Sequence, residues 1–299
     1  MVDADILLRA FRLMSTARAM AATYEQNRQV CKYVHSTSSG HEAIQLATAF
    51  QLSSEDYVSP YYRDESMLLG LGFSPEILMR QLLARGNDIF TGGKVYYTHP
   101  NIRSSDKPVI IHQSSATGMQ AIPATGVAQG LAFLEKKNPG EKRPLVLCSL
   151  GDASITEGEV SEAFQVAVLK KLPIIYLIQD NEWGISVTSD EARSMDAFEY
   201  AAGFPGMERI KIDGSDFEQS FYCMQQVFKY VREHRTPYLV QARVPLLTHH
   251  TSGVRMEAYR TAGDLEKHRA ADPLILLKRQ LQRHGVSGEH IDEIEKEAA

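Results

Sequence analysis

The apolar and polar positions in the middle of the chain predict a strand-helix-strand unit. Two short apolar runs, residues 145–150 and 174–178, have the length and composition of strands buried on both faces of a parallel sheet. The segment between them carries apolar side chains at helical spacing, namely Val160, Ala163, Phe164, Ala167 and Val168. Lys170 and Lys171 suit the negative end of a helix dipole, and Leu172-Pro173 ends the helix. This arrangement is typical of two parallel strands joined by a helix.

Similar patterns continue on both sides of this unit. Helices are predicted over residues 3–27, 41–50, 75–85, 118–137, 215–233, 273–284 and 287–299, and strands over residues 209–213 and 238–244. Residues 86–113 lack periodicity, and a loop of that length is usually functional. The order of elements indicates an α/β fold with a doubly wound, mainly parallel sheet and helices on both faces. We expect a single domain over residues 1–299, with an N-terminal helical extension at about 1–35 and C-terminal helices at about 264–299.

Candidate chemistry follows the two central strands. Asp152, in Gly151-Asp152-Ala153, comes just after the first strand, and Asn181 lies 29 residues later, just after the second. A right-handed crossover brings both residues to the same edge of the sheet. A carboxylate and a carboxamide supply the hard oxygen ligands that Mg²⁺ prefers, and a helix N-terminus after Gly151 adds N–H donors for an anion. The spacing predicts a metal-bridged diphosphate, although a Gly-Asp dipeptide taken alone is more often a plain turn.

At these residues the chain resembles the thiamine diphosphate signature, in which Gly-Asp-Gly is followed at nearly thirty residues by Asn-Asn. It is similar in particular to the alpha subunit of 2-oxo acid dehydrogenases of the branched-chain type. Segments 151–159, 62–64 and 38–43 resemble that subunit's metal loop, its Tyr-Arg-acid segment and its Gly-x-Glu-Ala helix start. Segments 114–126 and 249–252 resemble the segment under the thiazolium ring and the His-Ser loop near the catalytic entrance.

The resemblance implies a magnesium site and a diphosphate site. Asp152, Asn181 and the backbone carbonyl of Trp183 would bind Mg²⁺. The remaining residues that the resemblance assigns to cofactor binding are Tyr62, Arg63, Gly118, Met119, Ile122, Gly151, Ala153, Ser154, Gly184, Ile185 and His250. Among these, Met119 or Ile122 would support the bent cofactor from below. His250 is also the candidate catalytic residue, binding the substrate carboxylate or transferring a proton.

Several of these residues have a simpler interpretation or depart from the family pattern. Arg63 could be a surface salt-bridge partner, and His250 a polar loop residue. Ala153 replaces the second Gly of the signature, and Asp180 replaces the first Asn of the pair. A carboxylate at position 180 suits the site if it faces away from the phosphate. Thr251 replaces the phosphorylated Ser of the family's loop, so phosphorylation of this loop does not follow from the resemblance.

The implied reaction is the oxidative decarboxylation of a 2-oxo acid, with transfer of the acyl group to the lipoyl group of a dihydrolipoyl acyltransferase. The glutamate that activates the cofactor lies on the beta subunit in this family, so we expect this chain to act in an α2β2-type assembly. Alternatives are a pyruvate or acetoin dehydrogenase alpha subunit, a transketolase-like transferase, or a non-catalytic cofactor-binding module of the same fold. The last residues, 291–299, continue a helical pattern without a closing Gly or Pro, which is typical of a piece of a longer, fused alpha-beta chain.

Composition limits the other classes of function. A hydrophobic content of 43% and a charged content of 23% are ordinary for a globular protein, and a net charge of −5 gives no general attraction to nucleic acid or to anionic membranes. We expect neither partner. Cys31, Cys148 and Cys223 form no Cys-x-x-Cys pair and are odd in number, which favours neither disulfides nor structural zinc. The expected location is the reducing cytoplasm.

Overall fold

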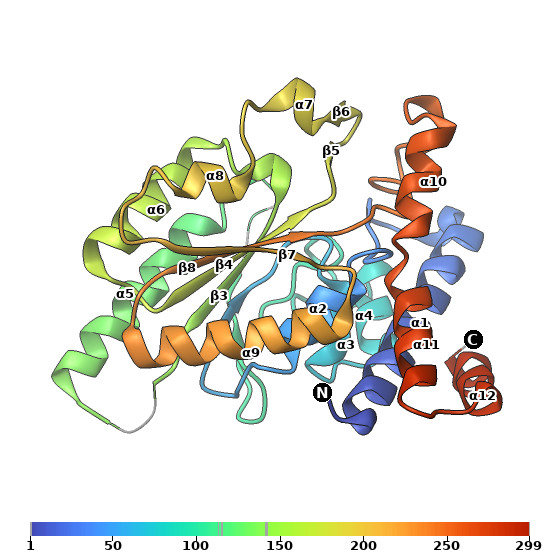
Figure 1. Cartoon of the computed structure of the whole chain (residues 1–299), viewed down its shortest axis with the longest axis horizontal. Helices are drawn as coiled ribbons and strands as arrows, with labels where there is room; N and C mark the ends of the chain where they lie inside the picture. The colour runs from blue at the N-terminus through green and yellow to red at the C-terminus, as the bar shows by residue number, and fades with distance from the viewer. Residues whose placement is uncertain (1, 113, 115, 141–142, 299) are drawn as a thin grey trace.

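The computed structural model describes residues 2–112, 114, 116–140 and 143–298. Within these residues, six parallel strands form the central sheet in the order β2-β1-β3-β4-β8-β7 (Figure 1). The strands are β1 (Tyr57–Ser59), β2 (Val109–Ile110), β3 (Val146–Gly151), β4 (Ile174–Asp180), β7 (Glu208–Asp213) and β8 (Tyr238–Arg243). The predicted doubly wound α/β fold is confirmed.

Helices cover both faces because successive strand residues point to opposite sides of the sheet. Leu145 and Leu147 belong to the cluster under α9 (Phe217–His234), whereas Val146 and Cys148 pack toward α5 (Ala121–Lys137), α6 (Gly158–Lys170) and α8 (Ala197–Ala201). Figure 1 shows α6 and α8 on one side of the strands and α9 on the other. Burial on both faces explains why β3 and β4 are continuous apolar runs.

The two ends of the chain pack together beside the sheet. The helix α1 (Ala4–Gln26) lies against α11 (Pro273–Arg283) and α12 (Gly288–Ala298), and Leu7, Leu281 and Ile294 belong to their shared apolar cluster. Arg18 on α1 forms ion pairs with Glu42 on α2 (Glu42–Ala49) and, at 2.8 Å, with Asp272 before α11. The other helices there are α4 (Pro75–Leu82) and α10 (Ala262–Ala270).

The predicted long elements are present with shifted ends, and the short ones were missed. The loop predicted over residues 86–113 contains β2, and β1, the helix α3 (Glu65–Gly70), the hairpin of β5 (Trp183–Gly184) with β6 (Val187–Thr188), and α7 (Ser189–Ala192) were not predicted. Strands of two or three residues carry no periodicity. Gln113, Ser115 and Ala299, which fall within predicted segments, lie outside the described residues, and the single-domain extent stays a prediction.

The connections create a reversal of winding between β1 and β3. From β1 the chain runs outward to β2 and then returns past β1 to β3, which pairs with β4 through the predicted strand-helix-strand unit. In open parallel sheets, ligands bind outside the carboxyl ends of the strands at such a point. Among the described residues, no helix has the length and apolar composition needed to cross a membrane.

Candidate functional site

A cavity of about 560 Å³ lies at the carboxyl ends of the central strands. Its walls come from the segments that follow β1, β2, β3 and β4, from residues 34–36 before α2, and from the loop around residue 250 beyond β8. Most of the predicted cofactor-binding residues line it, namely Tyr62, Gly118, Gly151, Asp152, Ala153, Ser154, Asn181, Trp183, Gly184, Ile185 and His250. The sheet topology therefore gathers residues that are as much as 188 positions apart, such as Tyr62 and His250.

Asp152 is the first residue after β3 and is buried at the cavity wall. Its Oδ2 forms an ion pair with Arg193 Nη1 at 2.9 Å, and the same guanidinium forms a second ion pair with Asp180 Oδ1 at 3.1 Å. Burial raises the pKa of Asp152, the negative charge of Asp180 raises it further, and Arg193 opposes both effects. An ionised Asp152 therefore depends on a nearby cation.

The predicted helix N-terminus directly after Gly151 is not there. Asp152–Ser154 form a 3₁₀ turn, and α6 begins only at Gly158, because the segment 155–157 intervenes. The backbone N–H groups that directly follow Gly151 at the cavity belong to this short turn. Ala153 lies against Gly184, where an added Cβ would come within 3.1 Å of the Ala153 side chain. The methyl group of Ala153 therefore fits because the residue opposite it, Gly184, has no side chain.

Asn181 is held by a buried network that sequence reasoning missed. Its Nδ2 lies 3.2 Å from His41 Nε2, and its Oδ1 accepts from the Trp183 N–H at 3.0 Å. His41 Nδ1 lies 2.9 Å from Gln179 Oε1. Because an amide N–H₂ donates to Nε2, the neutral ring carries its proton on Nδ1. Burial lowers the pKa of His41 well below its usual value, and Arg63 adds to the shift. The network fixes which way the Asn181 amide points.

The network continues from Gln179 into the core. Gln179 Nε2 donates to Asp64 Oδ1 at 2.7 Å and to Ser149 Oγ at 2.9 Å. Burial raises the pKa of Asp64 to about 6. Gln179 directly precedes the Asp180-Asn181 motif, but His41 lies 138 positions away from Gln179 in the sequence. No local signal in the sequence connects the two.

Arg63 does not line the cavity among the described residues. Its side chain is fully buried, its guanidinium carbon lies 5.5 Å from the centre of the Tyr62 ring, and the guanidinium donates to the carbonyls of Thr37 at 3.4 Å and His250 at 3.2 Å. Its Nε has no hydrogen-bond partner among the described residues, and the neighbouring Asp64 interacts with it only through its charge. The alternative of a surface salt bridge is wrong, since the side chain is not at the surface. The role of diphosphate ligand stays a prediction.

His250 lines the cavity and is held from both ring nitrogens. Ile185 N–H donates to Nδ1 at 3.3 Å, and Nε2 lies 3.3 Å from the Tyr62 hydroxyl. The neutral ring therefore carries its proton on Nε2. Burial, with a further contribution from Arg63, lowers the pKa of His250 to about 3, so the ring is neutral near pH 7. Its neighbour His249 is not part of the wall and accepts from Met256 N–H at 3.1 Å.

Backbone strain is present where the β5–β6 hairpin meets the cavity. The turn residue Ile185 has a φ of 57°, and Glu182 before the hairpin has a φ of 66°. A β-branched residue in this left-handed region is rare and costs about 1–3 kcal/mol. The side chain of Ile185 is 52% exposed, so packing does not explain its presence. The strained residue is the one that donates to His250.

Met119 and Ile122 lie outside the cavity wall and are both 39% exposed. The buried side of α5 is formed by Ala121, Ala124 and Ala128, which places Ile122 on the other side. Gly118 is at the wall with a φ of 83°, and an added Cβ would come within 3.0 Å of Glu157. The role of Met119 or Ile122 as a support for the cofactor stays a prediction, and a partner chain would have to complete that surface.

A second buried cluster adjoins the cavity and was also missed. Tyr97, which lines the wall, hydrogen-bonds to Glu65, and its hydroxyl lies 2.9 Å from that of Tyr24. Glu65 is fully buried, its Oε1 has no partner, and burial raises its pKa to about 7. Glu65 was not predicted as a site residue because it does not follow a predicted strand. It begins α3, a helix too short to be predicted from the sequence.

Comparison with known proteins is consistent with this geometry. The sequence family described as "Dehydrogenase E1 component" matches residues 11–299. The chain is 28% identical over 255 residues to the 2-oxoisovalerate dehydrogenase subunit alpha of Bacillus subtilis, covering 85% of this chain and 74% of that one. It is 27% identical over 246 residues to the pyruvate dehydrogenase E1 component subunit alpha of Rickettsia conorii, covering 81% and 71%.

A third relative extends the match further along this chain. It is the mitochondrial 2-oxoisovalerate dehydrogenase subunit alpha 2 of Arabidopsis thaliana, 26% identical over 287 residues, which are 95% of this chain and 58% of that one. The relatives act on different 2-oxo acids by name, so identity at this level does not choose between them. The chain belongs to the dehydrogenase E1 component family, the alpha subunits of the thiamine diphosphate-dependent 2-oxo acid dehydrogenases.

Proposed function

We propose that this chain forms the Mg²⁺ and diphosphate half of a thiamine diphosphate site in an α2β2-type 2-oxo acid dehydrogenase. The beta subunit, or a fused beta half, would supply the other half. The acyl product would pass to the lipoyl domain of a dihydrolipoyl acyltransferase. The observation that carries the proposal is the convergence of Asp152 and Asn181 on one cavity at the ends of adjacent parallel strands.

The residues at the cavity suit Mg²⁺ better than a softer metal. Asp152, the Asn181 amide and the Trp183 backbone offer hard oxygen atoms, and Mg²⁺ takes few protein ligands besides water and phosphate. Within the described residues, no three His, Cys, Asp or Glu side chains gather in a possible metal cluster, which disfavours zinc-like coordination. The cavity volume falls within the roughly 300–1,000 Å³ typical of cofactor sites.

The buried charge of Arg63 supports an anion beside the cavity. A buried guanidinium is expensive without a negative partner in contact with it, and the two carbonyl groups and the charge of the nearby Asp64 compensate it only in part. Its Nε remains unpaired. Arginine suits a diphosphate because its planar fork can bind two oxygens at once. For that contact, Arg63 has to become accessible from the cavity, which it does not line.

When bound, thiamine diphosphate supplies the carbanion chemistry of the decarboxylation. The residues of this chain anchor it, orient the 2-oxo acid and handle protons. His250, neutral and with its proton on Nε2, can donate a hydrogen bond from Nε2 to a substrate carboxylate in the cavity. The Ile185 N–H keeps that tautomer in place. The largely apolar wall limits the access of water to the reacting groups, and closure of the remaining opening would have to come from the partner.

We favour a branched-chain 2-oxo acid as substrate. Ile185-Ser186 and His249-His250 are similar to the branched-chain enzymes, and two of the relatives above carry the name 2-oxoisovalerate dehydrogenase. Pyruvate and acetoin are the alternatives. A cytoplasmic location is part of the proposal, since the free thiols of Cys31, Cys148 and Cys223 suit a reducing compartment.

The metal site is tested by Asp152→Asn, which removes a charge and keeps the size of the side chain. We expect the variant assembled with its beta partner to lose Mg²⁺-dependent binding of thiamine diphosphate, with a rise in Kd of at least about 100-fold, or ~2.7 kcal/mol. Isothermal titration calorimetry measures the Kd. Asp213→Asn is the matched control, because Asp213 ends β7 at the same sheet edge but lies outside this cavity. Equal affinity of wild type and Asp152→Asn, with intact circular dichroism, overturns the assignment.

A further inference from the structure

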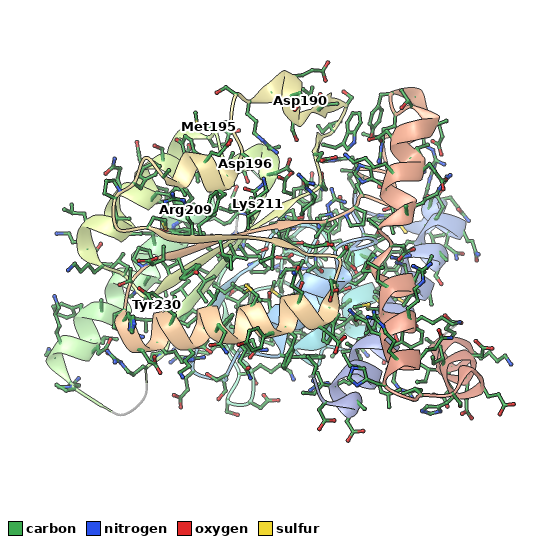
Figure 2. The ribbon with its side chains drawn as sticks, viewed as in Figure 1. Asp190, Met195, Asp196, Arg209, Lys211 and Tyr230 are labelled. Carbon is green, nitrogen blue, oxygen red and sulfur yellow. The ribbon has the colours of Figure 1, made fainter. Side chains whose placement is uncertain are left out.

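The guanidinium of Arg193 joins two buried carboxylates behind the cavity. Nη1 lies 2.9 Å from Asp152 Oδ2, and Nη2 lies 3.1 Å from Asp180 Oδ1. All three side chains are almost fully buried, with exposures of 6% for Arg193, 4% for Asp152 and 8% for Asp180. In Figure 2, the neighbouring Asp190, Met195 and Asp196 mark the segment that carries Arg193 from α7 to α8.

Asp180 faces away from the cavity and is held on its other side. Gln241 Nε2 donates to its Oδ2 at 2.6 Å, and the Glu182 N–H donates to its Oδ1 at 3.2 Å. Arg193 is fixed in turn by Ser189 Oγ, which accepts from Nη2 at 2.9 Å. Neither Asp180 nor Arg193 lines the cavity, whereas Asp152 does. The pair can therefore reach a ligand only through Asp152.

The net charge around Asp152 stays at −1 only when Asp180 and Arg193 are both present. Asp152, Asp180 and Arg193 together carry one net negative charge, as a lone Asp152 would with an amide at position 180. If Asp180 loses its charge, Arg193 has only Asp152 to neutralise and competes with a metal for it. If Arg193 is lost, two carboxylates face each other in a buried site, and Asp180 repels a diphosphate. Each single loss harms the site in a different way.

We propose that Arg193 and Asp180 are one charge-matched positioning pair that orients the Asp152 carboxylate toward a bound divalent cation. The proposal rests on the function proposed above. Groups that hold a metal ligand from behind change metal affinity by roughly 10–100-fold when they are removed. The sequence departure at position 180 is then compensated by Arg193, 13 positions further along the chain.

A double-variant cycle in the assembled enzyme tests the pair. We expect Asp180→Asn and Arg193→Met each to raise the Kd for Mg²⁺–thiamine diphosphate by about tenfold or more, and the double variant to bind more tightly than either single variant. Calorimetry gives the Kd, and thermal unfolding without cofactor separates binding from folding. Lys211→Met is the control, because it removes a cation paired with Asp196 in the same region (Figure 2).

The outcomes distinguish the two proposals. If wild type does not bind Mg²⁺–thiamine diphosphate, the proposed function fails. If wild type binds and the double variant is no tighter than the better single variant, the pairing is wrong. Should Arg193→Met fail to fold, Arg193→Gln replaces it in the same cycle, since glutamine also removes the positive charge while its amide keeps N–H donors for the two carboxylates. The same comparison with the double variant then decides.

Discussion

Glu65 is a buried acid beside the cavity with a consequence for stability. Because its pKa in the folded chain is about 7, above the usual 4.5, the folded state holds a proton that the unfolded state releases. This contribution to stability is fully present below pH 4.5 and is lost as the pH rises through 7. His250 has the opposite effect on stability at low pH. Because its pKa in the folded chain is lowered to about 3, the unfolded state binds a proton that the folded state does not, and the fold loses stability as the pH falls below 6.5.

Glu65→Gln removes the proton linkage and keeps an acceptor for the Tyr97 hydroxyl. We expect the unfolding free energy of the variant, relative to wild type, to increase by roughly 3 kcal/mol between pH 4.5 and pH 8, at about 1.4 kcal/mol per pKa unit. Urea unfolding at a series of pH values measures the difference, and circular dichroism checks the native fold at each. A difference that does not change with pH contradicts a raised pKa at Glu65.

Single residues also mark how far sequence reasoning reaches into the site. Asp152 and Asn181 were predictable because a strand end fixes the position of the next residue on the sheet edge. His41 and Arg193 were not, because each reaches the site through a side chain from a distant or irregular segment. Arg63 was predicted to bind the diphosphate, yet its fully buried position depends on the packing of Tyr62 and His250.

Among the elements, the β5–β6 hairpin is the one under strain. Ile185→Gly should raise the unfolding free energy by about 1 kcal/mol, because glycine adopts a positive φ without cost and little packing is lost. The midpoint of urea unfolding reports the change. Ile185→Val keeps the β-branched strain and should leave the midpoint near that of wild type. A less stable glycine variant means that the turn is not strained.

The helices and strands differ in how clearly the sequence predicts them. The buried strands β3 and β4 and the amphipathic α9 were predicted because each repeats its pattern over many residues. The strands β1 and β2 have three and two residues, and their pairing is set by the neighbours they join. The reversal of winding that locates the cavity depends on β1 and β2, so the sequence placed the site from the ends of β3 and β4 and from the motifs there, and not from this reversal.

At the scale of the whole molecule, we expect activity to require the beta partner. The purified chain should show no reduction of a dye acceptor by a 2-oxo acid, and adding the beta half should restore it with an increase in mass by light scattering. In the assembly, the rate with 2-oxoisovalerate should exceed those with pyruvate, 2-oxobutanoate and acetoin.

Two controls sharpen that measurement. The Asp152→Asn variant mixed with the beta half should show the same increase in mass by light scattering but remain inactive, which separates assembly from catalysis. Turnover by a demonstrated monomer of this chain contradicts the shared site. A higher rate with pyruvate than with 2-oxoisovalerate leaves the assembly intact and overturns only the choice of substrate.

The wall around His250 is tied to the early part of the chain. Ser36 Oγ donates to the His250 carbonyl at 2.7 Å across 214 positions, and Arg63 donates to the same carbonyl across 187. At about 5–20 residues per second, a ribosome needs on the order of 10–40 s to make the intervening segment. Throughout that time the nascent chain has Arg63 without the carbonyl that receives it. The cavity wall at His250 therefore cannot form until the segment around residue 250 has emerged from the ribosome.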